Sequence, residues 1–165
     1  MKQISLFSYI KLGEYMKIEI IDKDNIYFFI NNLYINNIDL NSKEEVSNYI
    51  KELIIKYHKR INMKGFYKVV VYTNKKIGVF IDVFKIDDSL YSRSLDLKII
   101  VNTNDKVYFK TKEYNVIPKD IDVYYYNKYF YFDITHIQDI IKIVDYGSFI
   151  YGEELESISN KLINI

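Results

Sequence analysis

The chain has 165 residues, a formal net charge of +1, 49% hydrophobic residues and 27% charged residues. This composition excludes intrinsic disorder, and the absence of cysteine excludes disulfides, thiolate metal sites and thiol nucleophiles. The apolar runs are strand-length and fall far short of the roughly 20 residues that span a bilayer, so we expect no membrane segment. One domain over residues 1–165 is the expectation for a chain of this length.

Amino-acid usage and the start of the chain bear on source and location. Ile, Lys, Asn and Tyr dominate while Ala, Gly, Pro and Arg are scarce, which indicates an A/T-rich genome, bacterial or from a bacterial virus. Residues 1–15 precede the first regular pattern and show no signal-peptide cleavage site, so they are an N-terminal arm or a mis-annotated start before Met16. Without cysteine or an export signal, we expect a cytoplasmic protein.

The first half of the chain predicts two hairpins with a helix between them. Ser42 and Glu45 form a capping box, in which each side chain satisfies the backbone N–H of the other residue. Apolar residues then recur at helical spacing from Val46 onward. The strands alternate polar and apolar residues and cover 16–22, 26–30, 66–73 and 77–86.

The second half predicts four more strands and two more helices. The strands cover 95–101, 106–112, 121–126 and 129–134, and the helices cover 135–144 and 153–163 with a short link at 148–151. We expect the strands from 66 to 112 to form a meander. The fold class is therefore α+β, in the order β-β-α-β-β-β-β-β-β-α-α. We expect a mainly antiparallel sheet of about six to eight strands with two or three helices packed on one face.

The hairpin at residues 121–134 has two different faces. A two-residue turn at Asn127-Lys128 pairs Tyr126 with Tyr129 and fixes the register. One face is expected to meet a core and carries Ile121, Val123, Tyr125, Phe130, Phe132 and Ile134. The other, here named the tyrosine face, carries Tyr124, Tyr126, Tyr129 and Tyr131. Strand propensity and cross-strand pairing explain these tyrosines structurally; alternatively, they form an amphipathic surface that binds another protein.

The same register places Asp122 directly opposite Asp133, where like charges repel. Solvent at the open end of the hairpin, the nearby Lys119, a raised pKa on one carboxylate or a bound cation would relieve this repulsion. Two carboxylates without further oxygen ligands make a poor metal site, so we prefer solvent and expect no metal.

Signals for catalysis are weak in this sequence. His58 and His136 have no partner nearby in the sequence, so we interpret both as surface histidines, with a role as a lone acid or base as the alternative. The five glycines fit neither a dinucleotide fingerprint nor a phosphate-binding loop, and no serine lies in a nucleophile elbow. We therefore expect no cofactor. An enzyme whose site combines dispersed His and Asp side chains stays an alternative.

A nucleic-acid module is the second alternative. The chain lacks a basic excess and has only two arginines, yet an aromatic sheet can stack bases and several lysines lie close together in sequence. These lysines are Lys51, Lys56, Lys59, Lys64 and Lys68.

The strand, strand, helix and hairpin of residues 16–84 are similar in order to the amino-terminal domain of bacterial MecA-type protease adaptors. Met16-Lys-Ile-Glu19 and residues 65–84 are the closest parts, and they cover under half of the chain. The acidic character of those adaptors is missing here.

We expect a small non-enzymatic intracellular binding protein that acts by protein contact, as an adaptor, an inhibitor or an immunity-type partner. The expected partner is another protein, and the expected oligomeric state is a monomer or a homodimer.

Overall fold

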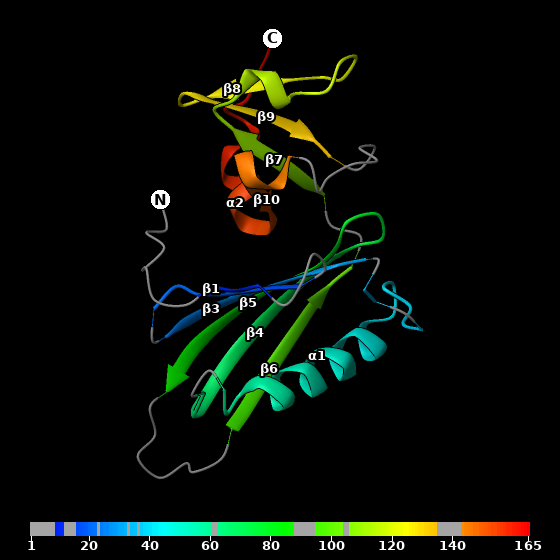
Figure 1. The fold of residues 1–165 in the computed structure, drawn as a ribbon, viewed down its shortest axis with the longest axis vertical. Coiled ribbons are helices and arrows are strands. Elements are labelled where there is room, and N and C mark those ends of the chain that lie inside the picture. The colour runs from blue at the N-terminus through cyan, green and yellow to red at the C-terminus, as the bar shows by residue number, and fades with distance from the viewer. Residues whose placement is uncertain are drawn as a thin grey trace. The chain divides into compact units, whose positions relative to one another are not determined.

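The structure is a computed structural model that describes residues 9–11, 16–22, 24–32, 34–35, 37–60, 63–87, 95–103, 106–134 and 143–165. The chain divides into two compact units, Met1–Asn104 and Asp105–Ile165. Each unit has its own sheet (Figure 1).

The first unit is a six-stranded sheet with one long helix. Its elements are β1 (Tyr9–Lys11), β2 (Met16–Ile20), β3 (Asn25–Asn31), α1 (Lys43–Tyr57), β4 (Gly65–Asn74), β5 (Gly78–Asp87) and β6 (Leu95–Asn102). The strand order is β1-β2-β3-β5-β4-β6. The two predicted hairpins are therefore present as β2–β3 and β4–β5, both antiparallel.

The core of the first unit lies between α1 and one face of this sheet. Period-two alternation sends Ile26, Phe28 and Ile30 of β3 to the helix side, where they are buried with the inward residues of β4 and β5. The apolar stripe of α1 completes the cluster with Val46, Ile50, Leu53 and Ile54. Figure 1 shows α1 running along this face beside β6.

The capping box at the start of α1 is half confirmed. Ser42 caps the helix, since its hydroxyl oxygen accepts from the Glu45 backbone N–H at 3.3 Å. The Glu45 carboxylate, however, accepts from the backbone N–H of Asp39 at 2.9 Å. The Ser42 backbone N–H, which we expected to donate to the Glu45 carboxylate, instead donates to the carbonyl of Asp39 in the loop before the helix.

The predicted meander is wrong at β6. This strand lies on the far side of β4 and pairs with it in parallel, in the register Val69 opposite Ile99. The alternation of β6 is equally compatible with pairing to β5 or to β4, because period two fixes the faces of a strand and not its neighbour.

The second unit is a five-stranded antiparallel sheet in the order β10-β7-β9-β8-β11. Its elements are β7 (Val107–Thr111), the 3-10 helix η1 (Tyr114–Val116), β8 (Tyr124–Tyr126), β9 (Tyr129–Asp133), the 3-10 helix η3 (Val144–Tyr146), β10 (Gly147–Tyr151), α2 (Gly152–Ser159) and β11 (Ile163–Asn164). The predicted link at 148–151 is in fact part of a strand, β10, which pairs with β7. The last helix ends at Ser159, and β11 follows it. The helix predicted at 135–144 lies mostly outside the described residues.

The α+β class with mainly antiparallel strands is confirmed, but the strands divide between two sheets instead of forming one. The two sheets separate after β6: within the described residues β6 pairs with β4 alone, whereas β7 pairs with β9 and β10. No helix among the described residues is long and apolar enough to cross a membrane.

Candidate binding surface on the second sheet

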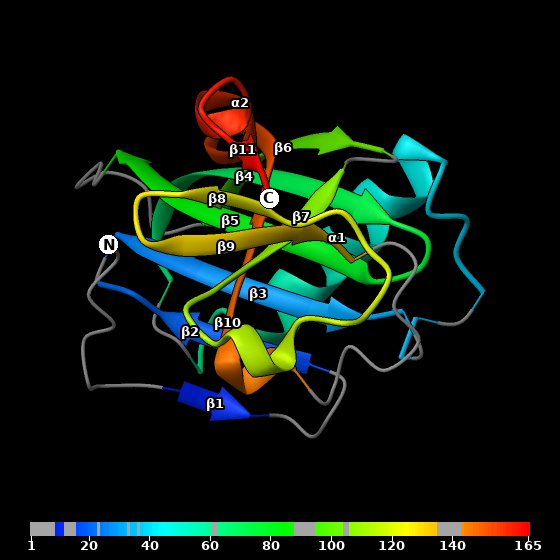
Figure 2. The same cartoon turned by 90° about the horizontal axis from the view of Figure 1, so that it is seen from above.

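The predicted hairpin turn and register are confirmed in β8 and β9. Tyr126 pairs with Tyr129, and Tyr124 with Tyr131. Asn127 and Lys128 have φ values of 49° and 70°, as both central residues of a type I′ turn require. Figure 2 shows the two strands side by side. The strands are shorter than predicted, because β8 begins only at Tyr124 and Ile121 and Asp122 precede it.

The face that we expected to meet a core is buried only toward the base of the hairpin. Phe132 and Ile134 are fully buried, and the Phe132 ring lies 5.7 Å from that of Phe109. Nearer the turn, Phe130 is only partly buried and Tyr125 is 38% exposed. The expectation therefore holds at the base and fails at the tip, because β11, the neighbour of β8, is only two residues long.

An exposed group of apolar side chains occupies this tip, and we name it the apolar patch. At its centre, the Phe130 ring lies 5.5 Å from the ring of Tyr114 and 5.4 Å from that of Tyr125. Ile163 stands directly opposite Tyr125, and the Ile165 N–H donates to the Val123 carbonyl. Tyr114 is 67% exposed, Ile163 65% and Ile165 62%. The patch thus consists of Tyr114, Tyr125, Phe130, Ile163 and Ile165.

The tyrosine face is covered in part. Tyr131 is 3% exposed, whereas Tyr124, Tyr126 and Tyr129 are partly buried. Burial raises the pKa of the Tyr131 hydroxyl, and the Glu154 carboxylate raises it further. Glu154 belongs to the first turn of α2, so this turn lies near the Tyr131 hydroxyl. Tyr131 is therefore a core residue of this unit and cannot serve as the centre of a free surface.

Three lysines lie over the outer tyrosine rings. The Lys110 ammonium is 4.1 Å from the centre of the Tyr129 ring, and that of Lys112 is 5.0 Å from the same ring. The Lys161 ammonium lies 5.8 Å from the ring of Tyr126. These are cation–π contacts, and the lysines occupy the ring faces that a stacking ligand would need.

The two carboxylates of the hairpin lie near a pair of stacked tyrosines. The rings of Tyr108 and Tyr124 are 6.1 Å apart. Burial raises the pKa of the Tyr108 hydroxyl, and Tyr124, Asp133 and Asp122 each add to the increase. Asp122 is exposed and precedes β8, so solvent reaches this end of the hairpin. Among the described residues, no three His, Cys, Asp or Glu side chains gather where they could hold a metal ion.

Of the two histidines, His58 belongs to the first unit, whereas Asp122 and Asp133 belong to the second. His58 caps the C-terminus of α1 in the first unit; its backbone N–H donates to the Ile54 carbonyl, and its Nδ1 lies 2.6 Å from the Ile55 carbonyl oxygen. His136 lies outside the described residues.

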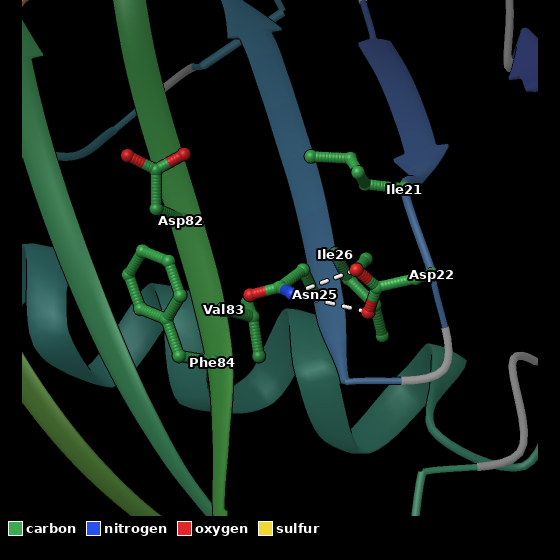
Figure 3. Close-up of a pocket in the computed structure, with 7 residues that line it drawn as sticks. All are labelled: Ile21, Asp22, Asn25, Ile26, Asp82, Val83 and Phe84. Carbon is green, nitrogen blue, oxygen red and sulfur yellow. Dashed lines mark hydrogen bonds between the residues drawn. The ribbon is translucent and has the colours of Figure 1, made fainter. Parts of the chain in front are cut away.

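A pocket of about 430 Å³ lies in the first unit, beside the β2–β3 turn (Figure 3). Its lining consists of Ile21, Asp22, Asn25, Ile26, Asp82, Val83 and Phe84. The Asn25 side-chain amide donates to both oxygens of the Asp22 carboxylate at 3.0 and 2.9 Å, and the Asp24 backbone N–H donates to it at 2.7 Å. The turn thus uses this carboxylate as a structural acceptor, and Figure 3 shows the Asp82 carboxylate apart from the Asp22–Asn25 pair.

Sequence reasoning found the tyrosine hairpin but missed the apolar patch. Tyr114 begins the 3-10 helix η1, whereas Ile163 and Ile165 lie about 50 residues later in the sequence. The available signal was the alternation Ile163-Asn164-Ile165, which fits a short strand with one apolar side. No protein-family model, curated protein or solved structure matches the chain.

Proposed function

We propose that the chain is a non-enzymatic binding protein that acts by contact with another protein, as an adaptor, an inhibitor or an immunity-type partner. The apolar patch is the observation that supports this proposal. Four of its five side chains are exposed and large, and they gather at one end of one sheet. Isolated exposed apolar residues are normal on any protein, whereas a contiguous group is typical of an interaction surface.

The chemistry of the patch suits a protein partner. Tyr114, Tyr125 and Phe130 are large aromatic side chains whose rings contact one another, and aromatic residues are enriched among the side chains that dominate protein–protein binding. The polar tip residues Asn127 and Lys128 are exposed at the edge of the hairpin. An apolar centre with a polar rim is the usual anatomy of a protein–protein interface.

A nucleic acid fits this sheet less well. The lysines over Tyr129 and Tyr126 favour such binding, since single strands are held by stacked aromatic rings and cationic side chains. A base would, however, have to displace the ammonium groups to reach these rings. Residues 105–165 also contain ten acidic residues against seven lysines and no arginine, which disfavours a polyanion.

The test is affinity purification from the native cell with wild-type chain and with a double variant, Tyr114→Ser with Ile163→Ser. Both changes remove exposed apolar surface, so we expect a folded protein that loses its partner. The matched control is Ile55→Ser, since Ile55 is 51% exposed on α1 in the first unit and should not affect the interaction.

Nuclease treatment of a parallel sample separates the two classes of partner. A protein partner should stay bound after the treatment and should be lost only from the double variant. Loss of the partner on nuclease treatment, or equal recovery with all three proteins, would contradict the proposal.

A further inference from the structure

An open strand edge in the first unit is a second surface, separate from the apolar patch. β6 is an outer strand of the six-stranded sheet: within the described residues it pairs with β4 on one side and with no strand on the other. It spans eight residues. The outward N–H and C=O groups of such a strand are a template for pairing with another chain, and natural proteins rarely leave a long edge of this kind uncovered.

The two faces of β6 differ in chemistry. Leu95, Leu97 and Ile99 point to the helix side, where they pack against the core but stay partly exposed at the edge. Asp96 and Lys98 alternate with them on the other face and are exposed. A partner strand would therefore meet apolar side chains on one face, and on the other one charge of each sign followed by Ile100, which is 36% exposed.

We propose that β6 pairs antiparallel with β6 of a second copy of this chain, so that the two sheets become continuous in a homodimer. The two-fold axis passes through Leu97, which lies opposite Leu97 of the partner subunit. This register places Leu95 opposite the partner's Ile99, and Asp96 opposite the partner's Lys98. By symmetry each interface has two such ion pairs, as expected for a self-complementary interface.

The positions of the charged residues favour this register over the registers shifted by one residue. A shift of the axis to Lys98 would place Lys98 opposite the partner's Lys98, and a shift to Asp96 would place two aspartates opposite each other. Intermediate registers bring a charged residue of one strand to the face where its partner has apolar residues. Only the register centred on Leu97 joins unlike charges on one face and apolar residues on the other.

The existing neighbour of Lys98 supports the same arrangement. On β4, Lys68 lies directly beside Lys98, and both side chains are exposed. This like-charge pair has no compensating acid in the register of β4 and β6, where the residue beside Asp96 is Phe66. The partner's Asp96 would lie next to this pair and would reduce the repulsion.

The first experiment measures molar mass by sedimentation and light scattering. The wild-type chain should be a dimer of the 19.9 kDa protomer. Lys98→Asp and Asp96→Lys each place like charges opposite each other, so each should give a monomer, and the double variant D96K/K98D should restore the dimer. Lys75→Asp, in the exposed turn between β4 and β5, is the control for charge reversal and should stay dimeric. Circular dichroism verifies that each variant is folded.

A cross-linking experiment tests the axis without changing charge. The chain has no cysteine, so Leu97→Cys introduces the only thiol. A residue on a two-fold axis meets its own copy, within the range of Cα separations that a disulfide allows. Mild oxidation should therefore yield a covalent dimer from Leu97→Cys. Leu95→Cys should not cross-link, because its neighbour in the proposed interface is the partner's Ile99.

Four results would overturn the proposal. The first is a wild-type chain that is monomeric at every concentration tested. The second is a dimer that withstands both single charge reversals, which would show that another surface holds it. The third is a double variant that stays monomeric while folded, and the fourth is equal cross-linking of both cysteine variants. Either of the last two would exclude the register centred on Leu97.

Discussion

The first unit packs branched aliphatic side chains between α1 and its sheet, whereas the second unit is built largely from aromatic rings. Ile, Val and Leu make up most of the buried cluster of the first unit. In the second unit, the Phe109 ring contacts those of Phe132 and Phe149, and at the tip the Phe130 ring contacts those of Tyr114 and Tyr125.

This difference has a consequence for where binding surfaces form. Aliphatic side chains have no polar atom, so they are stable mainly inside the core. Tyrosine combines a large apolar ring with a hydroxyl that water can satisfy, so a tyrosine-rich sheet can extend from its core to its surface. The second unit shows such a transition, from the fully buried Phe132 to the exposed Tyr125.

The largest effect is expected at Gly78, where the first unit depends on the lack of a side chain. Gly78 has φ +141°, and a Cβ there would overlap the Ile30 carbonyl oxygen. Gly78→Ala should therefore reduce the free energy of unfolding by about 3 kcal/mol or more, which urea unfolding curves would measure. Gly147→Ala in the second unit should cost less, because it meets a clash with the Lys110 carbonyl without a positive φ. Lys75→Ala is the neutral control, and equal losses at both glycines would contradict the backbone argument.

A loss of similar size is expected when the aromatic core of the second unit is opened. Phe109 is fully buried, so Phe109→Ala should reduce the free energy of unfolding by about 3 to 5 kcal/mol. Tyr114→Ala should change it by no more than about 0.5 kcal/mol, because that side chain is mostly exposed. A comparable loss from both variants would mean that the apolar patch contributes to the core and is not a free surface.

A gain is expected at the hairpin turn. Lys128 has φ 70°, which glycine adopts without the steric cost that a Cβ imposes. Lys128→Gly should therefore stabilise the protein by about 0.4 to 1 kcal/mol, and thermal unfolding measures the change. Lys119→Gly serves as the control in an exposed loop position of this unit and should give no gain.

The smallest effect concerns alkaline pH. Burial and Glu154 raise the pKa of Tyr131, so the folded state holds this proton more tightly than the unfolded state. Its contribution is present below the ordinary tyrosine pKa of about 10 and is lost as the pH rises through the higher folded value. Tyr131→Phe should therefore reduce the loss of stability between about pH 9 and pH 11, whereas Tyr114→Phe should not. If the free energy of unfolding fell with pH to the same extent in wild type and Tyr131→Phe, the Tyr131 hydroxyl would not be responsible for the loss.

Local signals predicted the elements well. Ser42 caps α1 as expected, and Asn127-Lys128 forms a turn that fixes a tyrosine register. Such features depend on a few adjacent residues and their backbone angles, so a single sequence contains the necessary information.

The sequence did not indicate which strands and helices lie side by side in the fold. The strand β6 alternates in the same way whether it follows β5 in a meander or joins β4, and β10 was too short to distinguish from a link. The environment of Tyr131 on the tyrosine face depends on α2, since Glu154 of that helix lies near Tyr131 only after the unit has folded. The apolar patch likewise combines Tyr114 of η1 with Ile163 and Ile165, which no local pattern connects.

The position of β6 also has a consequence for the order of assembly. β4 and β5 are joined by three residues and can form from local contacts, whereas β6 has nothing to pair with until β4 is in place. We expect the amides of β6 to gain protection in pulsed hydrogen exchange after those of β4 and β5, and simultaneous protection would contradict this sequence of events. The edge that we assign to dimer formation would then appear last, so that association of two copies follows the folding of each.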